Sequence, residues 1–401
     1  MAGAAAGTLE AKPLLEKVDV FEAGKDGYEI YRIPGIVVTR KGTVLAFCEA
    51  RKSSRGDWGT IDIMLRRSSD GGRTWSPRQK IADVTGLHAK NPVAMTQKLA
   101  TPDERTYNNP TAIVDRDGTV YFLFCLEYMR CFYMRSSDEG ETFSAPVEIT
   151  AAFEKFRPEY DWKVLATGPG HGIQMRSGRL VVPIWMSTGT GGHAHRPSVA
   201  SVIFSDDHGK TWRRGDIAVQ NTPQHVFPSE TVAEELADGR VMLNARSESK
   251  DHRRILVYSK DGATGWSAPR FHPQLLEPIC MASMVRFSTA RGGCRNRLLF
   301  SNPDNLERRD GKAAPGVNRD RRNLSVKLSY DEGETWPVSK TLEAGWSGYS
   351  DLAVTKDGMA LCFYERGGRD DKTFRTAALS IARFNLDWLT DGKDAGTGKA
   401  K

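Results

Sequence analysis

Long apolar runs are missing from this 401-residue sequence. No stretch approaches the ~18–20 consecutive apolar residues that a membrane-spanning helix needs, which excludes a helical membrane span. Segments with the 3.6-residue periodicity of an amphipathic helix are nearly absent as well, and Ala151–Phe156 is the best short candidate. The sequence therefore does not predict a parallel sheet with crossover helices.

Cysteine patterns typical of metal sites are also missing. The six cysteines include no Cys-x-x-Cys pair and no metal-ligand spacing with histidine. We therefore expect neither a metal nor a cofactor. Cys125 and Cys131 are near enough in sequence to form a disulfide, but their apolar, strand-like surroundings favour buried thiols.

Strong charge and targeting signals are lacking too. The formal net charge is only +7, and no basic block is interleaved with aromatic residues, so nucleic acid is not an expected partner. A mild positive field would suit a small anionic substrate. Met1–Gly7 has neither the basic start nor the apolar stretch of a signal peptide, which leaves the location open, secreted or periplasmic if a leader was removed. Nothing indicates an oligomeric state.

What the sequence does contain is a repeated pattern, Ser-x-Asp-x-Gly-x-Thr-aromatic, usually called an Asp box. In such a turn Asp can accept hydrogen bonds from backbone N–H groups, Gly supplies a positive φ, and the aromatic ring packs onto the sheet. A residue needed once per active site would not recur, so the boxes indicate a repeat architecture rather than catalysis. The four copies begin at Ser68, Ser136, Ser205 and Ser329.

A second periodicity agrees with the boxes. Six times an apolar run meets a tight turn and is followed by a second apolar run. A degenerate fifth box, Ser259–Trp266, falls in the longest interval between two Asp boxes. Each unit then contains two hairpins, which predicts an all-β fold, a six-bladed β-propeller of four-stranded antiparallel blades. The turn glycines are Gly42, Gly118, Gly178, Gly239, Gly293 and Gly358.

The ring must close without an open edge. Val18–Glu22 precedes the first hairpin and could complete the last blade beside Ala377–Phe384. We therefore expect one propeller domain over residues 18–388, with tails at 1–17 and 389–401.

Three arginines from three units stand at the ends of predicted inner strands. Arg32 lies in Tyr31-Arg32-Ile33-Pro34, Arg246 ends a strand of the fourth unit, and Arg321 enters a strand of the fifth. Converging guanidinium groups are suited to a carboxylate, which they bind in planar, bidentate fashion.

The Tyr-Arg-Ile-Pro start resembles the Phe/Tyr-Arg-Ile-Pro motif of the exo-sialidases (neuraminidases), and with the Asp boxes the resemblance covers nearly the whole chain. It implies that Arg32, Arg246 and Arg321 form a triad around the carboxylate of sialic acid. Arg322 is the neighbouring alternative to Arg321, although the Arg-x-Asn-Leu pattern favours Arg321.

The resemblance also implies catalytic roles. Asp57, in a loop similar to the acid/base loop of the family, would be the general acid, with Asp62 as the alternative. Tyr349 would be the nucleophile and Glu230 its base, with Glu234 and Glu235 as alternatives.

Supporting residues follow from the same resemblance. Arg51 would support the substrate pocket, and Glu365 would orient Arg32 through a charge pair. The family-like segment Gly168–Gly172 contains His171, to which we assign no role.

The function implied is that of a retaining exo-α-sialidase, which would hydrolyse terminal sialic acid from glycans, glycoproteins or glycolipids through a covalent sialyl-tyrosine. Sialidases with a tyrosine nucleophile are a known exception to the carboxylate pair of most glycosidases. A neutral phenol meets no repulsion from the substrate carboxylate, and a base can remove its proton during attack. The alternatives are a non-catalytic sialoglycan-binding propeller and a trans-sialidase or anhydro-forming sialidase.

Overall fold

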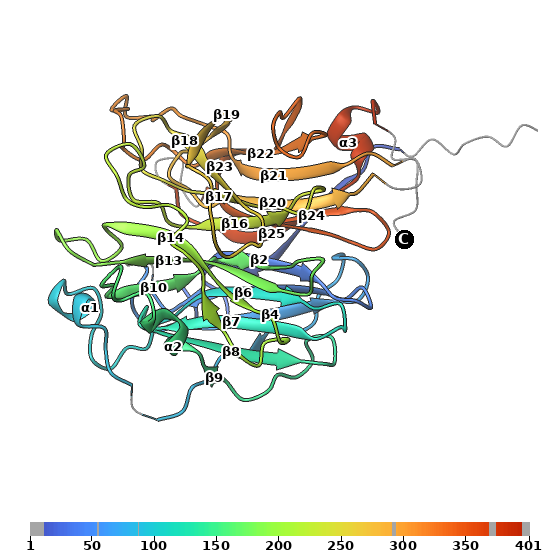
Figure 1. Cartoon of the computed structure of the whole chain (residues 1–401). Helices are drawn as coiled ribbons and strands as arrows, with labels where there is room; N and C mark the ends of the chain where they lie inside the picture. The colour runs from blue at the N-terminus through green and yellow to red at the C-terminus, as the bar shows by residue number, and fades with distance from the viewer. Residues whose placement is uncertain (1–11, 54–55, 87, 291–293, 369–373, 395–401) are drawn as a thin grey trace, which may run out of the picture.

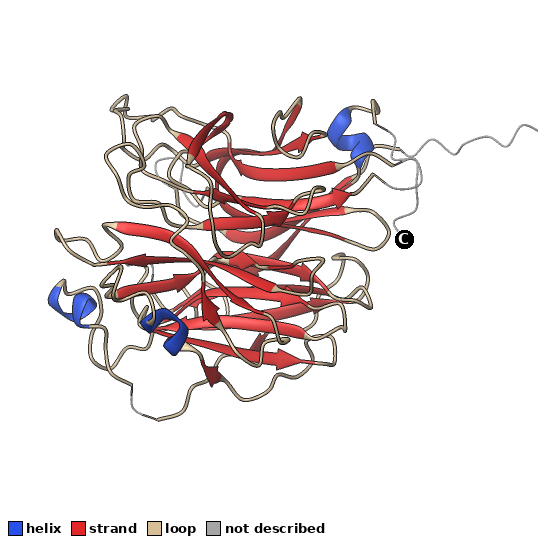
Figure 2. Ribbon diagram, viewed as in Figure 1, coloured by secondary structure: helices blue, strands red, loops and turns tan. Residues whose placement is uncertain are grey.

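Strands dominate the computed structural model, which describes residues 12–53, 56–86, 88–290, 294–368 and 374–394 (Figure 2). The fold is therefore all-β, as predicted. Within these ranges each helix has five residues, and none is long and apolar enough to span a membrane. The helices are α1 (Pro92–Thr96), α2 (Thr150–Glu154), which overlaps the predicted helical segment, and α3 (Leu386–Thr390).

The sheets follow one another along the chain, each built from consecutive hairpins. The first has the order β2 (Ile30–Val38), β3 (Val44–Arg51), β4 (Ile61–Ser68) and β5 (Gln79–Lys80). The second contains β6 (Tyr107–Val114), β7 (Val120–Leu126), β8 (Arg130–Ser136) and β9 (Val147–Glu148), and β11 (Gly170–His171) joins β6 in parallel. The third contains β10 (Val164–Thr167), β12 (Ile173–Gln174), β13 (Leu180–Ser187), β14 (Ser198–Ser205) and β15 (Arg213–Arg214). The fourth contains β16 (Thr231–Glu235), β17 (Val241–Ala245), β18 (Arg253–Ser259) and β19 (Arg270–Leu276).

The last sheet has seven strands because one long strand is shared. β23 (Val338–Val354) has 17 residues; its first part pairs with β22 and its second part with β24. Figure 1 shows the red C-terminal strands beside the blue N-terminal ones. The remaining members are β20 (Ser283–Ser288), β21 (Arg297–Pro303), β22 (Arg322–Ser329), β24 (Ala360–Arg366), β25 (Ala378–Phe384) and β1 (Leu15–Glu22).

The N-terminal strand pairs with the C-terminal one, as the closure argument predicts. β1 lies antiparallel to β25, with Val18 opposite Ile381. Both expected domain boundaries need correction. β1 begins at Leu15 rather than Val18, because Leu15 pairs with Phe384. At the other end, residues beyond 388 belong to the fold, since α3 runs to Thr390 and the buried Asp394 forms an ion pair of 2.5 Å with Arg297.

The turn glycines of the hairpins lie between paired strands, with the exception of Gly293, which falls outside the described residues. The Asp boxes also form the expected turns. In the second box the Asp138 carboxylate accepts from Thr142 N at 2.9 Å and from its hydroxyl at 2.5 Å. The degenerate fifth box forms a similar turn, in which the Asp261 carboxylate accepts from Thr264 N at 2.8 Å.

Apolar side chains pack mainly between neighbouring sheets. Phe47 on β3 meets Phe122 on β7 edge to face, with ring centroids 4.9 Å apart. Burying an aromatic side chain of this kind contributes about 1.5–3 kcal/mol. Cys125 and Cys131 are buried opposite each other on β7 and β8 and are free thiols.

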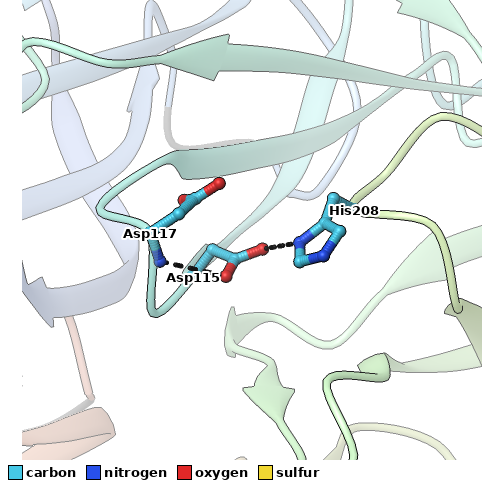
Figure 3. Close-up of side chains that lie close together, drawn as sticks. All are labelled: Asp115, Asp117 and His208. Carbon is cyan, nitrogen blue, oxygen red and sulfur yellow. Dashed lines mark hydrogen bonds and ion pairs between the residues drawn. The ribbon is translucent and has the colours of Figure 1, made fainter.

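In three boxes the residue after the aspartate ties the box to the preceding unit, which the sequence did not predict. Glu139, His208 and Glu332 occupy this place with φ of 62°, 55° and 61°. Glu139 accepts from the Thr39 hydroxyl, and Glu332 accepts from the backbone N–H of residue 237 at 2.7 Å. His208 Nδ1 lies 2.8 Å from the buried carboxylate of Asp115 (Figure 3). The boxes therefore connect neighbouring sheets as well as closing their own hairpins.

The contact between His208 and Asp115 predicts a pH-dependent stability. The hydrogen bond to the Asp115 carboxylate raises the pKa of His208. Burial alone would raise the pKa of Asp115, but the hydrogen bonds that this carboxylate accepts outweigh burial and lower its pKa. The histidine contribution is complete below about pH 6.5, the ordinary pKa, and is lost as the pH rises through the raised folded-state value. The difference in melting temperature between wild type and His208→Gln should therefore be larger at about pH 5.5 than at about pH 9. Differential scanning calorimetry at both pH values measures it, and a gap that widens with pH would contradict this assignment.

Candidate active site

One cavity of about 180 Å³ collects most of the predicted site residues. They come from strands and strand ends that are far apart in the sequence, because the ends of β2, β16, β17, β22 and β23 meet there. The predicted residues that line the cavity are Arg32, Asp57, Glu230, Arg246, Arg321 and Tyr349.

The backbone is irregular where these strands reach the cavity. Ile33, Asn109 and Asn323 have φ of 59°, 51° and 59°, and strand register shifts at each of them. A positive φ is unfavourable for a β-branched residue such as isoleucine. Bulges of this kind re-aim side chains, and strained backbone clusters at functional sites. The bulges next to Arg32 and Arg321 direct these side chains into the cavity.

Arg32 is held by Glu365, the partner that the resemblance implied. Its Nε donates to Glu365 Oε1 at 2.9 Å and its Nη2 to Oε2 at 3.2 Å. The buried Glu365 carboxylate, on β24, also accepts from the backbone N–H groups of Ile33 at 3.1 Å and Tyr349 at 3.0 Å. One carboxylate therefore fixes both the arginine and the strand that carries Tyr349.

The other two arginines lie around the same tyrosine. Arg246 Nη1 donates to Tyr349 Oη at 2.8 Å and forms an ion pair with Glu230. The Arg321 guanidinium lies 5.0 Å from the Tyr349 ring centroid and donates to the Ile279 carbonyl at 2.9 Å. Across the described residues no carboxylate forms an ion pair with Arg321. The alternative Arg322 instead lies 5.6 Å from the Trp346 ring.

Tyr349 and Glu230 form a buried hydrogen-bonded pair. Tyr349 is 5% exposed, and its hydroxyl donates to Glu230 Oε1. Burial and the charge of Glu230 raise the pKa of Tyr349 far above its ordinary value, despite the nearby arginines. The phenol is therefore protonated near neutral pH, with a base in contact with its proton. The alternatives lie elsewhere, since Glu234 accepts from Arg286 N and Glu235 pairs with Arg176.

Asp57 lies at the more open side of the cavity, with 40% of its side chain exposed. Its Oδ1 is 3.0 Å from Arg51 Nη1 and 3.9 Å from Arg32 Nη1, and its Oδ2 is 3.9 Å from His195 Nδ1. Partial burial would raise the pKa of Asp57, but the guanidinium groups of Arg51 and Arg32 outweigh it and hold the pKa well below the ordinary range. Asp62 instead accepts from Tyr28 and pairs with Lys80, both at 2.7 Å.

Arg51, the expected support of the substrate pocket, does not itself line the cavity but contacts Asp57, which does. Its side chain is 3% exposed and donates to the Gly56 carbonyl at 2.6 Å as well as to Asp57. Behind it Glu49 accepts at 2.7 Å and also holds the Asn109 N–H at 2.8 Å. Sequence reasoning missed Glu49, although its opposite charge two residues before Arg51 on one face of β3 was a usable signal.

An aromatic wall beside Asp57 was also missed. His195 lies between Tyr128 and Trp185, with ring centroids 5.0 and 5.1 Å away, and Trp58 is 6.3 Å away. Burial is the main cause that lowers the pKa of His195 to about 4, so this ring is neutral near pH 7. No shared pattern marks these residues, because Trp185 lies on β13 and the others come from separate loops and turns.

Potential metal ligands gather elsewhere. In the described part of the chain one group of three such side chains is found, Asp115, Asp117 and His208, at the turns shown in Figure 3. Asp115 already accepts from Gln174 at 2.8 Å and contacts His208, and none of the three lines the cavity. The cluster therefore acts as a contact between turns.

Comparison with known proteins agrees with the repeats and the site. A profile of the BNR repeat-like domain matches residues 95–362, and a sialidase of Micromonospora viridifaciens is 30% identical over 94% of this chain. The chain belongs to the sialidase family. A second sialidase, from Bacteroides fragilis (strain YCH46), is 28% identical over 84% of this chain. The chain spans 55% and 60% of the lengths of these two sialidases.

Solved structures agree with this family assignment. The Hadza microbial sialidase Hz136 is 28% identical, with a TM-score of 0.72 that covers 93% of this chain and 69% of that one. The intramolecular trans-sialidase from Ruminococcus gnavus shares the fold at 19% identity, with a TM-score of 0.70 over 92% of this chain and 98% of its own.

The buried pair of Glu365 with Arg32 predicts a large loss of stability in this sialidase-family chain when the carboxylate is removed. Glu365→Ala would leave the mostly buried Arg32 charge and two backbone N–H groups without their acceptor. The free energy of unfolding should fall by about 3–5 kcal/mol, which urea denaturation measures. The control is Glu141→Ala, which removes an exposed carboxylate 3.6 Å from Arg67 and should cost less than about 1 kcal/mol. Equal losses in the two variants would show that the Glu365 pair contributes no more than an exposed one.

Proposed function

We propose that this chain is a retaining exo-α-sialidase, which releases terminal sialic acid from glycans, glycoproteins or glycolipids through a covalent bond between the sugar and Tyr349. The observation that carries this proposal is the contact of the buried Tyr349 hydroxyl with Glu230 and Arg246. Arg32 and Arg321 lie 5.2 and 5.0 Å from the same ring.

The scaffold of this proposed enzyme is a six-bladed propeller. The seven-stranded sheet counts as two blades, because the long β23 serves as the outer strand of one and the inner strand of the next. The pairing of β1 with β25 would then close the ring. With the four preceding sheets, this count would give the six blades of the proposed propeller.

The substrate carboxylate would bind between Arg32, Arg246 and Arg321. Arg32 and Arg246 have carboxylate partners in Glu365 and Glu230, whereas Arg321 contacts only a carbonyl among the described hydrogen-bond acceptors. Among the described residues the Arg321 guanidinium therefore has no carboxylate partner, and it lies in a small, partly enclosed cavity. Guanidinium groups in this arrangement bind a carboxylate through charge-assisted, bidentate hydrogen bonds.

In the first step the Tyr349 oxygen attacks the anomeric carbon while the glycosidic bond breaks. Glu230 takes the phenolic proton, and Asp57 gives its proton to the departing oxygen. Arg246 Nη1 lies 2.8 Å from Tyr349 Oη and stabilises the negative charge that develops on the tyrosine oxygen as it loses its proton. In the second step water attacks the anomeric carbon while the bond between this carbon and the Tyr349 oxygen breaks. Asp57 accepts a proton from the water, and the tyrosine oxygen regains its proton from Glu230. Two displacements retain the anomeric configuration.

Asp57 must be protonated to act as the acid, yet the arginines around it favour its ionised form in the free protein. Substrate binding would reverse this preference. A carboxylate that pairs with Arg32 cancels part of the positive field, and the sugar excludes water from Asp57, and both effects raise the pKa of this carboxyl. The acid would thus form mainly in the complex.

The pH dependence and the leaving group together test the role of Asp57. Because kcat/KM reports the free enzyme and kcat the complex, the alkaline decline of kcat should lie at higher pH than that of kcat/KM. Asp57→Asn should lower kcat by about 10²–10⁴-fold for a natural sialoside and much less for an aryl sialoside that needs no protonation. Asp62→Asn is the matched control and should leave both rates near wild type. Equal losses on both substrates would rule Asp57 out as the acid.

Tyr349→Phe tests the nucleophile and the function together. The variant keeps the ring and the three arginines, so affinity for sialic acid should change little, while release from an aryl sialoside should fall by at least about 10³-fold. Product analysis by mass spectrometry on a panel of linkage-defined sialosides should detect free sialic acid from the wild type. Undiminished release by the variant would refute the nucleophile. Sialyllactose binding without cleavage would indicate a binding protein, and a transferred or anhydro product would indicate a trans-sialidase.

A further inference from the structure

A second group of polar side chains lies beside the pair of Tyr349 and Glu230, one step farther along the same strands. On β23 Asp351 follows Tyr349 by two residues, and on β16 Glu234 stands four residues after Glu230, which immediately precedes that strand. Asp351 and Glu234 are buried, and neither belongs to the described lining of the cavity. This polar group therefore has no contact with a substrate in the cavity.

Asp351 is the centre of this group. Its Oδ1 lies 2.7 Å from His171 Nδ1 and accepts from the Ser283 hydroxyl at 2.8 Å, and its Oδ2 accepts from Ile36 N at 2.9 Å. These partners lie on β11, β20 and β2, so one carboxylate connects three strands to β23. A buried carboxylate is tolerated only with such partners, and removing it would leave their donors unpaired.

Two of the connected strands carry proposed catalytic groups. Ile36 follows Arg32 on β2, and Asp351 follows Tyr349 on β23. The close approach of β11 depends on Gly170, where a Cβ would lie 3.2 Å from Asp351 Oδ1 and 2.9 Å from Met281 Cε. Met281 in turn packs in the apolar cluster around Tyr349. Asp351 is thus connected to Tyr349 through Gly170 and Met281.

The charged side chains of this group shift one another's pKa values. Burial would lower the pKa of His171, but Asp351 and Glu234 outweigh it and raise the pKa. Burial raises the pKa of Glu234 to about 7, against the opposing effects of Arg286 and His171. The two carboxylates therefore favour the protonated form of His171, against the effect of burial.

We propose that Asp351, held by His171 and Ser283, is a positioning residue for Tyr349. It fixes β23 against β2 and so sets where the tyrosine hydroxyl stands relative to Arg32 and to the sugar. The consequence for catalysis rests on the proposed sialidase function, whereas the placement of the tyrosine does not.

The test compares Asp351→Asn with Asp115→Asn in the full chain. The two aspartates are matched, because each is 1% exposed and lies 2.7–2.8 Å from a histidine Nδ1, but Asp115 stands in a turn outside the cavity. Both variants should lower the melting temperature. Only Asp351→Asn should lower kcat, by at least about 10-fold with KM within about twofold, because small misplacements of a reacting group cost up to about 10²-fold. Equal kcat values in the two variants would overturn the proposal.

An NMR measurement, which needs no turnover, tests the positioning role of Asp351 separately from the proposed sialidase function. With tyrosines labelled by ¹³C at Cζ, the Tyr349 resonance is assigned as the one missing in Tyr349→Phe. Asp351→Asn should shift this resonance in the unliganded protein, and Asp115→Asn should not. If the wild type releases no sialic acid but the shift occurs, the proposed function fails and the positioning role stands. An unmoved resonance overturns the positioning role, whatever the activity. Should Asp351→Asn fail to fold, Ser283→Ala is the second variant. It removes the hydrogen bond that Ser283 donates to Asp351 and the one that Ser283 Oγ accepts from Leu352 N at 3.0 Å. It is expected to give a smaller shift of the same resonance, and no shift would contradict the proposal.

Discussion

Three arginine side chains around one buried tyrosine form the constraint on which the rest of the site depends. A guanidinium group removed from water costs several kcal/mol unless it is paired. Glu365 pairs with Arg32 and Glu230 with Arg246, whereas Arg321 contacts the Ile279 carbonyl. The cavity is therefore arranged before any ligand arrives. The Arg321 guanidinium, which has no carboxylate partner among the described residues, favours an anionic ligand.

The repeated sheets supply the rigidity that this arrangement needs. Side chains held at strand ends are placed more accurately than side chains on long loops. Each described Asp box closes a hairpin, and the residues after three of the box aspartates contact the preceding unit as well. The polar group around Asp351 connects inner strands close to Tyr349. The scaffold is thus stabilised both at its turns and next to the site.

How much the sequence could predict depended on whether a residue lay in a recognisable pattern. The spacing of the boxes and hairpins predicted an all-β repeat fold and the pairing of the N-terminal strand with β25. Family motifs led to Arg32, Asp57 and Tyr349, and the structure brings these together in one cavity. The sequence favoured Glu230 over Glu234 and Glu235, because those two fall within the strand pattern that follows, and Glu230 lines the cavity.

Other features depend on contacts between distant segments, which no local pattern records. Arg51 contacts Asp57 and Glu49 instead of lining the cavity. The aromatic wall around His195 and the role of His171 as a partner of Asp351 are visible only in three dimensions. The sequence did not predict the continuous β23, because its two halves have the pattern of strands from separate units. The predicted domain start at Val18 lies three residues after the true start of β1, because Leu15 is recognised as part of a strand only through its pairing with β25.

The central claim is that Tyr349 forms a covalent bond with the sugar. A fluorinated sialosyl fluoride, which forms the intermediate quickly and hydrolyses it slowly, would trap that state, and intact-protein mass spectrometry followed by peptide mapping would locate the added mass. The account predicts one equivalent of the sugar on the peptide that contains Tyr349. Release of sialic acid from a sialoside with no adduct on this peptide, or with an adduct on another residue, would contradict it.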